Sequence, residues 1–229
     1  MLAQTRRHFA DIDSTNTYAL AWSDAPDGAL VTADTQSAGR GRLGRIWSSP
    51  PDVGLYFSLV LRNLAPQTKA RLSLLVGLAV AEAVQEQIDL LVQIKWPNDI
   101  LARGHKIGGI LCEATGDRVI AGVGLNLNQT QDQLPVRPLF PASSLLLETN
   151  RTWEKDTILE AILRVLEIQL DRDWRPQRAE IERRLFGLGE LAKAGGAMGL
   201  IQGIGDDGAL LLRTADGVTD IKSGEVEFF

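Results

Sequence analysis

Residues 39–45, Gly-Arg-Gly-Arg-Leu-Gly-Arg, place three arginines and three glycines in seven positions. Glycine lets backbone N–H groups approach a ligand closely, and arginine grips phosphate or carboxylate in a fork while it stays charged. These residue types predict an anion-binding loop. The alternative is a solvated Arg/Gly tail that binds nucleic acid. We favour the loop, because the stretch is short, does not repeat and is flanked by ordered-looking sequence. The identity of the anion stays open.

A second cluster, residues 95–99 with the sequence KWPND, ends an expected strand with polar groups. Proline stops the strand, and the Asn98–Asp99 pair at its exit suits a hydrated Mg²⁺ that carries phosphates. A plain Pro-Asn-Asp turn is the alternative. Lys106, which precedes the sequence IGGIL, is either solvated or directed at an anion. Asn126 interrupts an apolar strand, so its amide must bond a backbone group or a ligand.

Composition limits the class of protein. The 229 residues allow one large domain or one domain plus a small one. A net charge of −5 and a pI of about 5.1 argue against general nucleic-acid binding. A single cysteine, Cys112, excludes an intramolecular disulfide. The sequence shows no signal peptide and no apolar run that could cross a bilayer, so we expect a soluble cytoplasmic protein with no nucleic-acid or membrane partner.

The elements that must position these residues follow from hydrophobic periodicity. Helices are expected at residues 15–23, 70–87, 156–174 and 176–187. Strands are expected at residues 29–35, 54–61, 92–96, 107–113 and 119–128. Residues 129–143, with three prolines, predict a surface connection. Strands and helices without regular alternation predict an α+β domain. From residue 194 on, short apolar runs alternate with turn signals, which predicts a small all-β module docked on the main domain.

In this order, six segments resemble the biotin protein ligases, and the resemblance covers essentially the whole chain. The segments are DSTN (13–16), TQSAGRGRLGRIW (35–47), KWPNDI (95–100), KIGGIL (106–111), GVGLNLN (122–128) and GEVEF (224–228). The resemblance implies an α+β fold, with a mixed β-sheet flanked by helices as in class II synthetases and biotinyl/lipoyl ligases. It assigns a catalytic domain to residues 1–187 and a small SH3-like β-barrel to residues 188–229. It also implies the monofunctional type, without a DNA-binding domain.

The resemblance further implies the reaction. Such an enzyme activates biotin with ATP to biotinyl-5′-AMP, with Mg²⁺ as the cofactor of ATP. It then transfers biotin to a specific lysine of a biotin carboxyl carrier protein. A homodimer is a possible assembly. Two rivals are a lipoate or octanoyl ligase, which differs in the acyl group, and a regulator that binds biotinyl-AMP and DNA, which the acidic pI disfavours.

The site residues that the resemblance implies fall into four sets. Biotin is expected to contact Ser14, Thr15, Asn16, Gln36, Arg40, Gly41, Arg42, Lys106 and Gly109. ATP and the adenylate are expected to contact Gly39, Arg40, Arg42, Arg45, Trp47, Asn98 and Asn126, and Asp99 is expected to hold the metal. Arg42, Lys106 and Lys95 are the expected catalytic residues. They would act by positioning and electrostatics, and Lys95 or Asp99 could assist deprotonation of the acceptor lysine.

Overall fold

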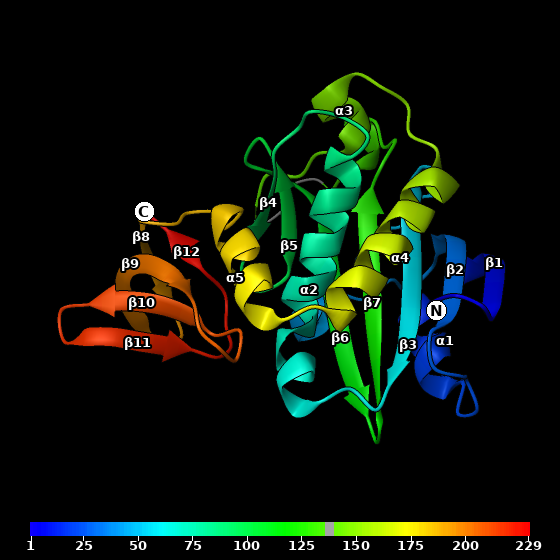
Figure 1. Cartoon of the computed structure of the whole chain (residues 1–229). Coiled ribbons are helices and arrows are strands. Elements are labelled where there is room, and N and C mark those ends of the chain that lie inside the picture. Colours follow the sequence, from blue (N-terminus) through cyan, green and yellow to red (C-terminus); the bar gives the residue numbers. More distant parts are fainter. Residues whose placement is uncertain (136–139) are drawn as a thin grey trace.

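The computed structural model describes residues 1–135 and 140–229, which build two β-sheets (Figure 1). The larger sheet has seven strands in the order β1-β2-β3-β7-β6-β5-β4. Its strands are β1 (Arg6–Ile12), β2 (Ala29–Gln36), β3 (Gly54–Arg62), β4 (Val92–Lys95), β5 (Asp99–Ala102), β6 (His105–Thr115) and β7 (Arg118–Asn126). The β1–β2 pair is parallel and the other neighbouring pairs are antiparallel, so the sheet is mixed.

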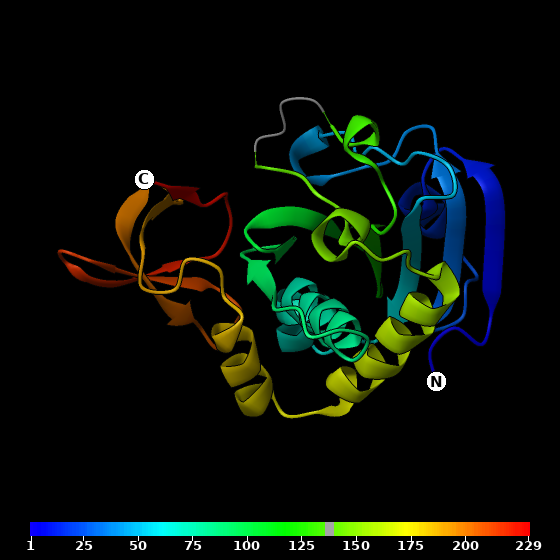
Figure 2. The same cartoon turned by 90° about the horizontal axis from the view of Figure 1, so that it is seen from above.

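Five α-helices accompany the two sheets in the described part of the chain. They are α1 (Thr15–Ala21), α2 (Pro66–Gln85), α3 (Leu145–Thr149), α4 (Lys155–Asp171) and α5 (Trp174–Arg183), and single 3₁₀ turns lie at Arg42–Gly44 and Gln131–Gln133. Helices α2 and α4 lie together against one face of the sheet (Figure 2). None of the helices in the described residues is long and apolar enough to cross a membrane.

The period of two along β3 and β7 separates a face that packs in the main core from a second face, which carries α1. On β3, Leu55, Phe57 and Leu59 belong to the main core, which also contains side chains of α2 and α4. Val60 of β3 and Ile120 of β7 pack instead in a second, smaller cluster with α1. The second face is therefore the one to which α1 and its polar N-terminus are attached.

The smaller sheet has the order β11-β10-β9-β8-β12 and is antiparallel. Its strands are β8 (Leu191–Ala194), β9 (Ala197–Ile204), β10 (Leu210–Thr214), β11 (Gly217–Ile221) and β12 (Glu227–Phe228). The predicted α+β class is confirmed. The C-terminal strands form an open sheet, however, since β11 and β12 remain its two edges and no closed barrel is found in the described chain. The domain boundary after residue 187 stays a prediction.

Two strands of the large sheet were not expected from the sequence. Strand β1, Arg6–Ile12, is an edge strand whose residues are mostly exposed, so it lacks the alternation of a half-buried strand. Strand β5, Asp99–Ala102, is only four residues long and begins where the sequence reads as a turn. Helix α2 starts at Pro66, earlier than expected, since proline is well placed in the first helical turn. Residues 136–139 of the expected surface connection lie outside the described residues.

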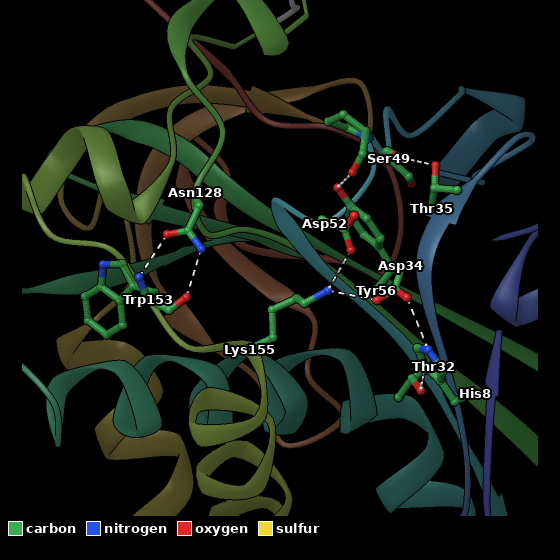
Figure 3. A network of polar contacts seen from close by, with 11 residues as sticks. His8, Thr32, Asp34, Thr35, Ser49, Asp52, Tyr56, Asn128, Trp153 and Lys155 are labelled. Carbon is green, nitrogen blue, oxygen red and sulfur yellow. Dashed lines mark hydrogen bonds and ion pairs between the residues drawn. The ribbon is translucent and has the colours of Figure 1, made fainter. Parts of the chain in front are cut away.

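A polar network fastens the start of α4 to the first two strands (Figure 3). Lys155 Nζ lies 2.8 Å from Asp34 Oδ1 on β2, and Asp34 Oδ2 lies 3.2 Å from His8 Nε2 on β1. The hydrogen bond from Lys155 lowers the pKa of Asp34. A carboxyl with a depressed pKa in the folded state stabilises the fold above its unfolded-state pKa. That contribution is lost as the pH falls through the folded-state value.

We therefore expect Lys155→Met to lower the free energy of unfolding by about 1 kcal/mol at neutral pH. The difference from the wild type should shrink in acid, below the lowered pKa of Asp34, because the carboxyl is then protonated in both proteins. Urea unfolding of both proteins at neutral and acidic pH measures this. Lys69→Met, near the start of α2, is the matched control. An equal loss at both pH values would mean that Lys155 acts through packing and not through its charge.

Candidate active site

The Gly/Arg loop, residues 39–47, connects β2 to β3 and closes on itself. The Gly41 N–H donates to the Arg45 carbonyl at 2.8 Å, and the Trp47 N–H donates to the Gly39 carbonyl at 2.9 Å. The turn between them needs positive φ angles, 55° at Leu43 and 73° at Gly44. The closed turn spreads the three arginine side chains, so each finds a different partner.

Arg40 is held on the second face of the sheet by Glu113 of β6. Its guanidinium makes two parallel hydrogen bonds to the carboxylate, at 2.8 and 3.1 Å. Glu113 Oε2 also accepts a hydrogen bond from Asn16 Nδ2 at 3.0 Å. A fork of this kind fixes the plane of the guanidinium as well as its position. Glu113 therefore ties the loop to the N-terminus of α1.

The other two arginines contact the C-terminal module, and Arg42 also contacts Asn98, which directly precedes β5. Arg42 Nη1 lies 3.3 Å from both Asn98 Oδ1 and the Gly224 carbonyl. Arg45 forms an ion pair with Glu225, which lowers the pKa of Glu225 and raises that of Arg45. The C-terminal module therefore takes part in positioning the Gly/Arg loop.

A network of neutral polar groups lies at the N-terminus of α1. Gln36 Oε1 accepts from the Thr15 N–H at 2.9 Å, and Gln36 Nε2 donates to Ser49 Oγ at 2.8 Å. Ser58 Oγ, fully buried on β3, lies 2.6 Å from Asn16 Oδ1 and 2.8 Å from Thr15 Oγ1. Each amide is thereby held in one orientation, so these groups form a preorganised uncharged surface.

Beside this network, three glycines leave the backbone of the sheet without side chains. A Cβ on Gly122 would lie 2.0 Å from Asn16 Oδ1, and a Cβ on Gly124 would lie 2.4 Å from Trp47 Nε1. A Cβ on Gly109 would lie 3.2 Å from the Trp47 ring. Asn16 and Trp47 therefore rest directly on the strand backbone. The indole N–H of Trp47 is buried and has no hydrogen-bond partner among the described residues.

Two lysines and a carboxylate lie at the other end of the site. Lys106 Nζ is 2.6 Å from Asp99 Oδ1 and 5.6 Å from the centre of the Trp47 ring. Lys95 ends β4 and is 9% exposed. Burial lowers the pKa of Lys95; Asp99 opposes this effect and Lys106 adds to it. The region carries more positive than negative side chains, which suits a polyanion.

These groups surround one cavity of about 130 Å³. It brings together all but two of the residues that the sequence predicts for the site: Ser14, Thr15, Asn16, Gln36, Arg40, Gly41, Arg42, Arg45, Trp47, Lys95, Asn98, Asp99, Lys106 and Gly109. Gly39 does not line it; this glycine lies at the base of the loop, where a Cβ would be 2.5 Å from the Trp47 carbonyl. Asn126 lines a second, larger cavity instead.

The second cavity has a volume of about 930 Å³ and adjoins the first. The residues shared by both are Arg45, Ile46, Trp47, Lys95, Asp99, Lys106 and Glu225. Its remaining lining is largely apolar and includes Leu134, Val226 and Phe228. The site thus has a neutral polar end, a charged middle and an apolar outer chamber.

Sequence reasoning missed several of the groups that build this site. Glu113, Glu225 and Ser58 carried no local signal of their own. Gly122 and Gly124 did carry one, because they alternate with apolar residues in a strand, where glycine is unfavourable. That spacing indicates a close approach of another group to one face of the strand.

The fold and the site are those of a ligase for a biotin-like or lipoate-like acid. Residues 9–129 match the Biotin/lipoate A/B protein ligase family, and residues 193–228 match the Biotin protein ligase C terminal domain. The chain belongs to the biotin/lipoate A/B protein ligase family, and it is an enzyme of the biotin protein ligase class.

Full-length relatives agree with this assignment. The chain is 35% identical to the biotin–[acetyl-CoA-carboxylase] ligase of Paracoccus denitrificans, over 100% of this chain and 99% of that protein. It is 34% identical to the ligase of the same name from Mycobacterium tuberculosis, over 87% of this chain and 79% of that protein. The biotin protein ligase of Aquifex aeolicus, solved in complex with biotin and ATP, superposes with a TM-score of 0.87 at 31% identity, covering 99% of each chain.

Proposed function

We propose that the two cavities bind biotin and ATP side by side and that the chain condenses them to biotinyl-5′-AMP. One observation carries this proposal: across two adjoining cavities the lining changes from neutral hydrogen-bonding groups, through arginines and lysines, to an apolar chamber. That order matches an uncharged ureido head, then a carboxylate beside a triphosphate, and then an adenine base.

The neutral end suits the biotin head. The ureido group is uncharged and has both donors and acceptors, as do the hydroxyls and amides of Thr15, Asn16 and Gln36. The bare backbone at Gly122 lets Asn16 sit on the strand. Trp47 rests on Gly124 of the same strand, and its indole would help to enclose the ligand. Ser14 completes this end, Gly109 lies beside Lys106 in the charged part of the site, and Gly41 lies where the acid would meet the loop.

The first chemical step needs no covalent bond to the protein. An oxygen of the biotin carboxylate attacks the α-phosphorus of ATP, a new P–O bond forms, and the bond to the departing pyrophosphate breaks. Arg42 and Lys106 neutralise the negative charge that develops, while Asp99 holds Lys106 and Asn98 holds Arg42. Catalysis then consists of positioning and electrostatic stabilisation. Arg40 and Arg45 add to the grip on the acid and the phosphates.

The proposal includes Mg²⁺ with ATP, and the residues present fit it. Asp99 lines both cavities beside Lys95 and Lys106, where the phosphates would lie. Mg²⁺ usually takes one or two carboxylates and completes its shell with phosphate and water oxygens. Asp99 would supply that carboxylate. The ion would neutralise charge on the phosphates.

The second step transfers biotin to a lysine of a carrier protein. The neutral amine attacks the carbonyl carbon of the mixed anhydride, an amide bond forms, and AMP leaves with the electrons of the broken C–O bond. The amine must first lose a proton. Lys95, whose pKa is lowered by burial, or Asp99 could assist. From the family resemblance we also expect a homodimer and a cytoplasmic location.

Pyrophosphate exchange into ATP tests the proposed first step. The reaction is followed with Mg²⁺ and either biotin, lipoate or no acid. Exchange that depends on biotin supports the proposal. Exchange with lipoate alone would mean that the enzyme activates lipoate in place of biotin, and the fold assignment would be unaffected. Absence of exchange with either acid would contradict adenylation at this site.

The lowered pKa of Lys95 predicts how nucleotide affinity depends on pH. A bound triphosphate favours the protonated lysine, so binding should raise this pKa again. Affinity for ATP should then fall about tenfold per pH unit between the free-enzyme and bound-state pKa values. Lys95→Arg stays charged at every such pH and should remove this alkaline loss. The KM for ATP, measured across the alkaline range in both proteins, decides the question, and parallel profiles would exclude Lys95 as the titrating group.

A further inference from the structure

A single carboxylate on β6 bonds to two different parts of the site. Glu113 accepts two hydrogen bonds from the Arg40 guanidinium, at 2.8 and 3.1 Å, and its Oε2 also accepts from Asn16 Nδ2 at 3.0 Å. Arg40 and Asn16 both line the first cavity, whereas Glu113 does not. In the described part of the chain no hydrogen bond joins Arg40 directly to Asn16. Glu113 therefore links two lining residues without being part of the lining.

The place of Glu113 on β6 fixes it beside the cavity. Side chains alternate along a strand, so residues 109, 111 and 113 share one face of β6, and Gly109 and Leu111 line the first cavity. The backbone of Glu113 is held by pairing with Ile120 of β7. Asn16 Nδ2 donates to the Leu111 carbonyl at 3.2 Å as well as to Glu113. The amide of Asn16 thus uses its two N–H groups on β6.

Arg40 is the residue through which Glu113 acts on the Gly/Arg loop. It pairs with Ile46 across the loop as an isolated β-bridge, next to the hydrogen bond from Gly41 to Arg45. A bidentate fork fixes both the position and the plane of a guanidinium, so Glu113 holds the arm of the loop that carries Arg40. The guanidinium has more N–H groups than the fork uses. Those that are left remain available to a bound anion.

We infer that Glu113 is a positioning residue that couples the neutral end of the site to the Gly/Arg loop. It sets the Asn16 amide and the Arg40 guanidinium in one arrangement, so displacing either one loosens the other. Loss of the carboxylate would leave Arg40 without a counter-charge and an Asn16 N–H without an acceptor. This inference rests on the proposed function and adds a residue that acts on biotin binding through two others.

A double-mutant cycle in biotin binding tests the coupling. Arg40→Met and Asn16→Ala each remove one partner of Glu113, and isothermal titration with biotin, without ATP, gives the dissociation constant of each variant. Because the two residues share Glu113, the double variant should lose about tenfold less affinity than the product of the two single losses. Losses that simply multiply would overturn the inference. This cycle keeps Glu113, so it does not depend on the folding of a Glu113 variant.

The same cycle on a Glu113→Gln background isolates the carboxylate. Glutamine keeps the size of the side chain but presents an amide N–H₂ to one of the two donors, so this substitution alone should weaken biotin binding about 10- to 100-fold. On this background the losses from Arg40→Met and Asn16→Ala should multiply, because the group that couples them is gone. Thermal unfolding verifies that the variants are folded. Coupling that persists in folded Glu113→Gln would overturn the inference.

Two further variants separate this role from a general effect of charge. Glu113→Asp keeps the charge on a side chain one methylene shorter, which cannot reach both donors, so it should weaken biotin binding much as Glu113→Gln does. Wild-type affinity in this variant would overturn the positioning role. Glu160→Gln is the matched control, because Glu160 also accepts a fork from an arginine, Arg6, but lines neither cavity. It should leave the affinity for biotin unchanged.

The outcomes distinguish this inference from the proposed function. A wild type that binds biotin but shows no biotin-dependent pyrophosphate exchange would overturn the proposed function, and the titrations would still decide the role of Glu113. Normal exchange together with multiplying losses in the first cycle would overturn only the role of Glu113. A wild type that binds no biotin would overturn both.

Discussion

Lys106→Met should lower the maximal rate of biotin-dependent pyrophosphate exchange by about 10²- to 10³-fold. The side chain lies in both cavities, and its ammonium is held 2.6 Å from Asp99. At that position it can stabilise the charge that develops as the carboxylate oxygen bonds to phosphorus. Methionine keeps most of the length and apolar volume of lysine, so the substitution removes chiefly the positive charge. Initial rates at saturating biotin and ATP measure this effect.

The control for this prediction is Lys193→Met, an exposed position on β8 outside both cavities. It should leave the exchange rate unchanged. Direct binding of biotin, followed without ATP, should be weakened far less than the rate by Lys106→Met. If the maximal rate were preserved and only the KM for ATP rose, Lys106 would be a ground-state binding residue with no special role in the transition state.

Gly122→Ala should weaken biotin binding by about 100-fold or more. The added Cβ would lie 2.0 Å from Asn16 Oδ1, a distance that no relaxed structure keeps, so the Asn16 side chain must move. Moving it breaks the contacts with Ser58, Leu111 and Glu113 together. The strand itself should survive, since alanine is compatible with extended backbone. Isothermal titration with biotin gives the affinity, and thermal unfolding reports whether the fold is retained.

A double-mutant cycle tests the stated cause of that loss. Asn16→Ala alone should also weaken biotin binding, because it removes the same amide. On that background Gly122→Ala should cost little more, since the atoms with which its Cβ collides are gone. The two effects should therefore be strongly non-additive. Additive losses would show that Gly122→Ala acts through the sheet and not through Asn16.

Much of the site could be predicted from local sequence, because two of its parts are continuous segments. The Gly/Arg loop and the KWPND segment place their charges within a few residues of one another, so type and spacing are visible without a fold. Periodicity likewise predicted the long helices and the central strands. It failed for β1 and β5, where an exposed edge and a four-residue length leave no periodic pattern to detect.

The sequence by itself determined which groups are available: a loop with three arginines, two lysines, one useful carboxylate and a set of neutral amides and hydroxyls. Only the tertiary structure decided how they are paired. Arg40 meets a carboxylate 73 residues away, and Arg45 meets one 180 residues away on the C-terminal module. Strand pairing across the sheet also decides which buried hydrogen-bond acceptors have no partner and at which glycines a Cβ would collide with a neighbour. These contacts are non-local, so nothing in the spacing of neighbouring residues records them.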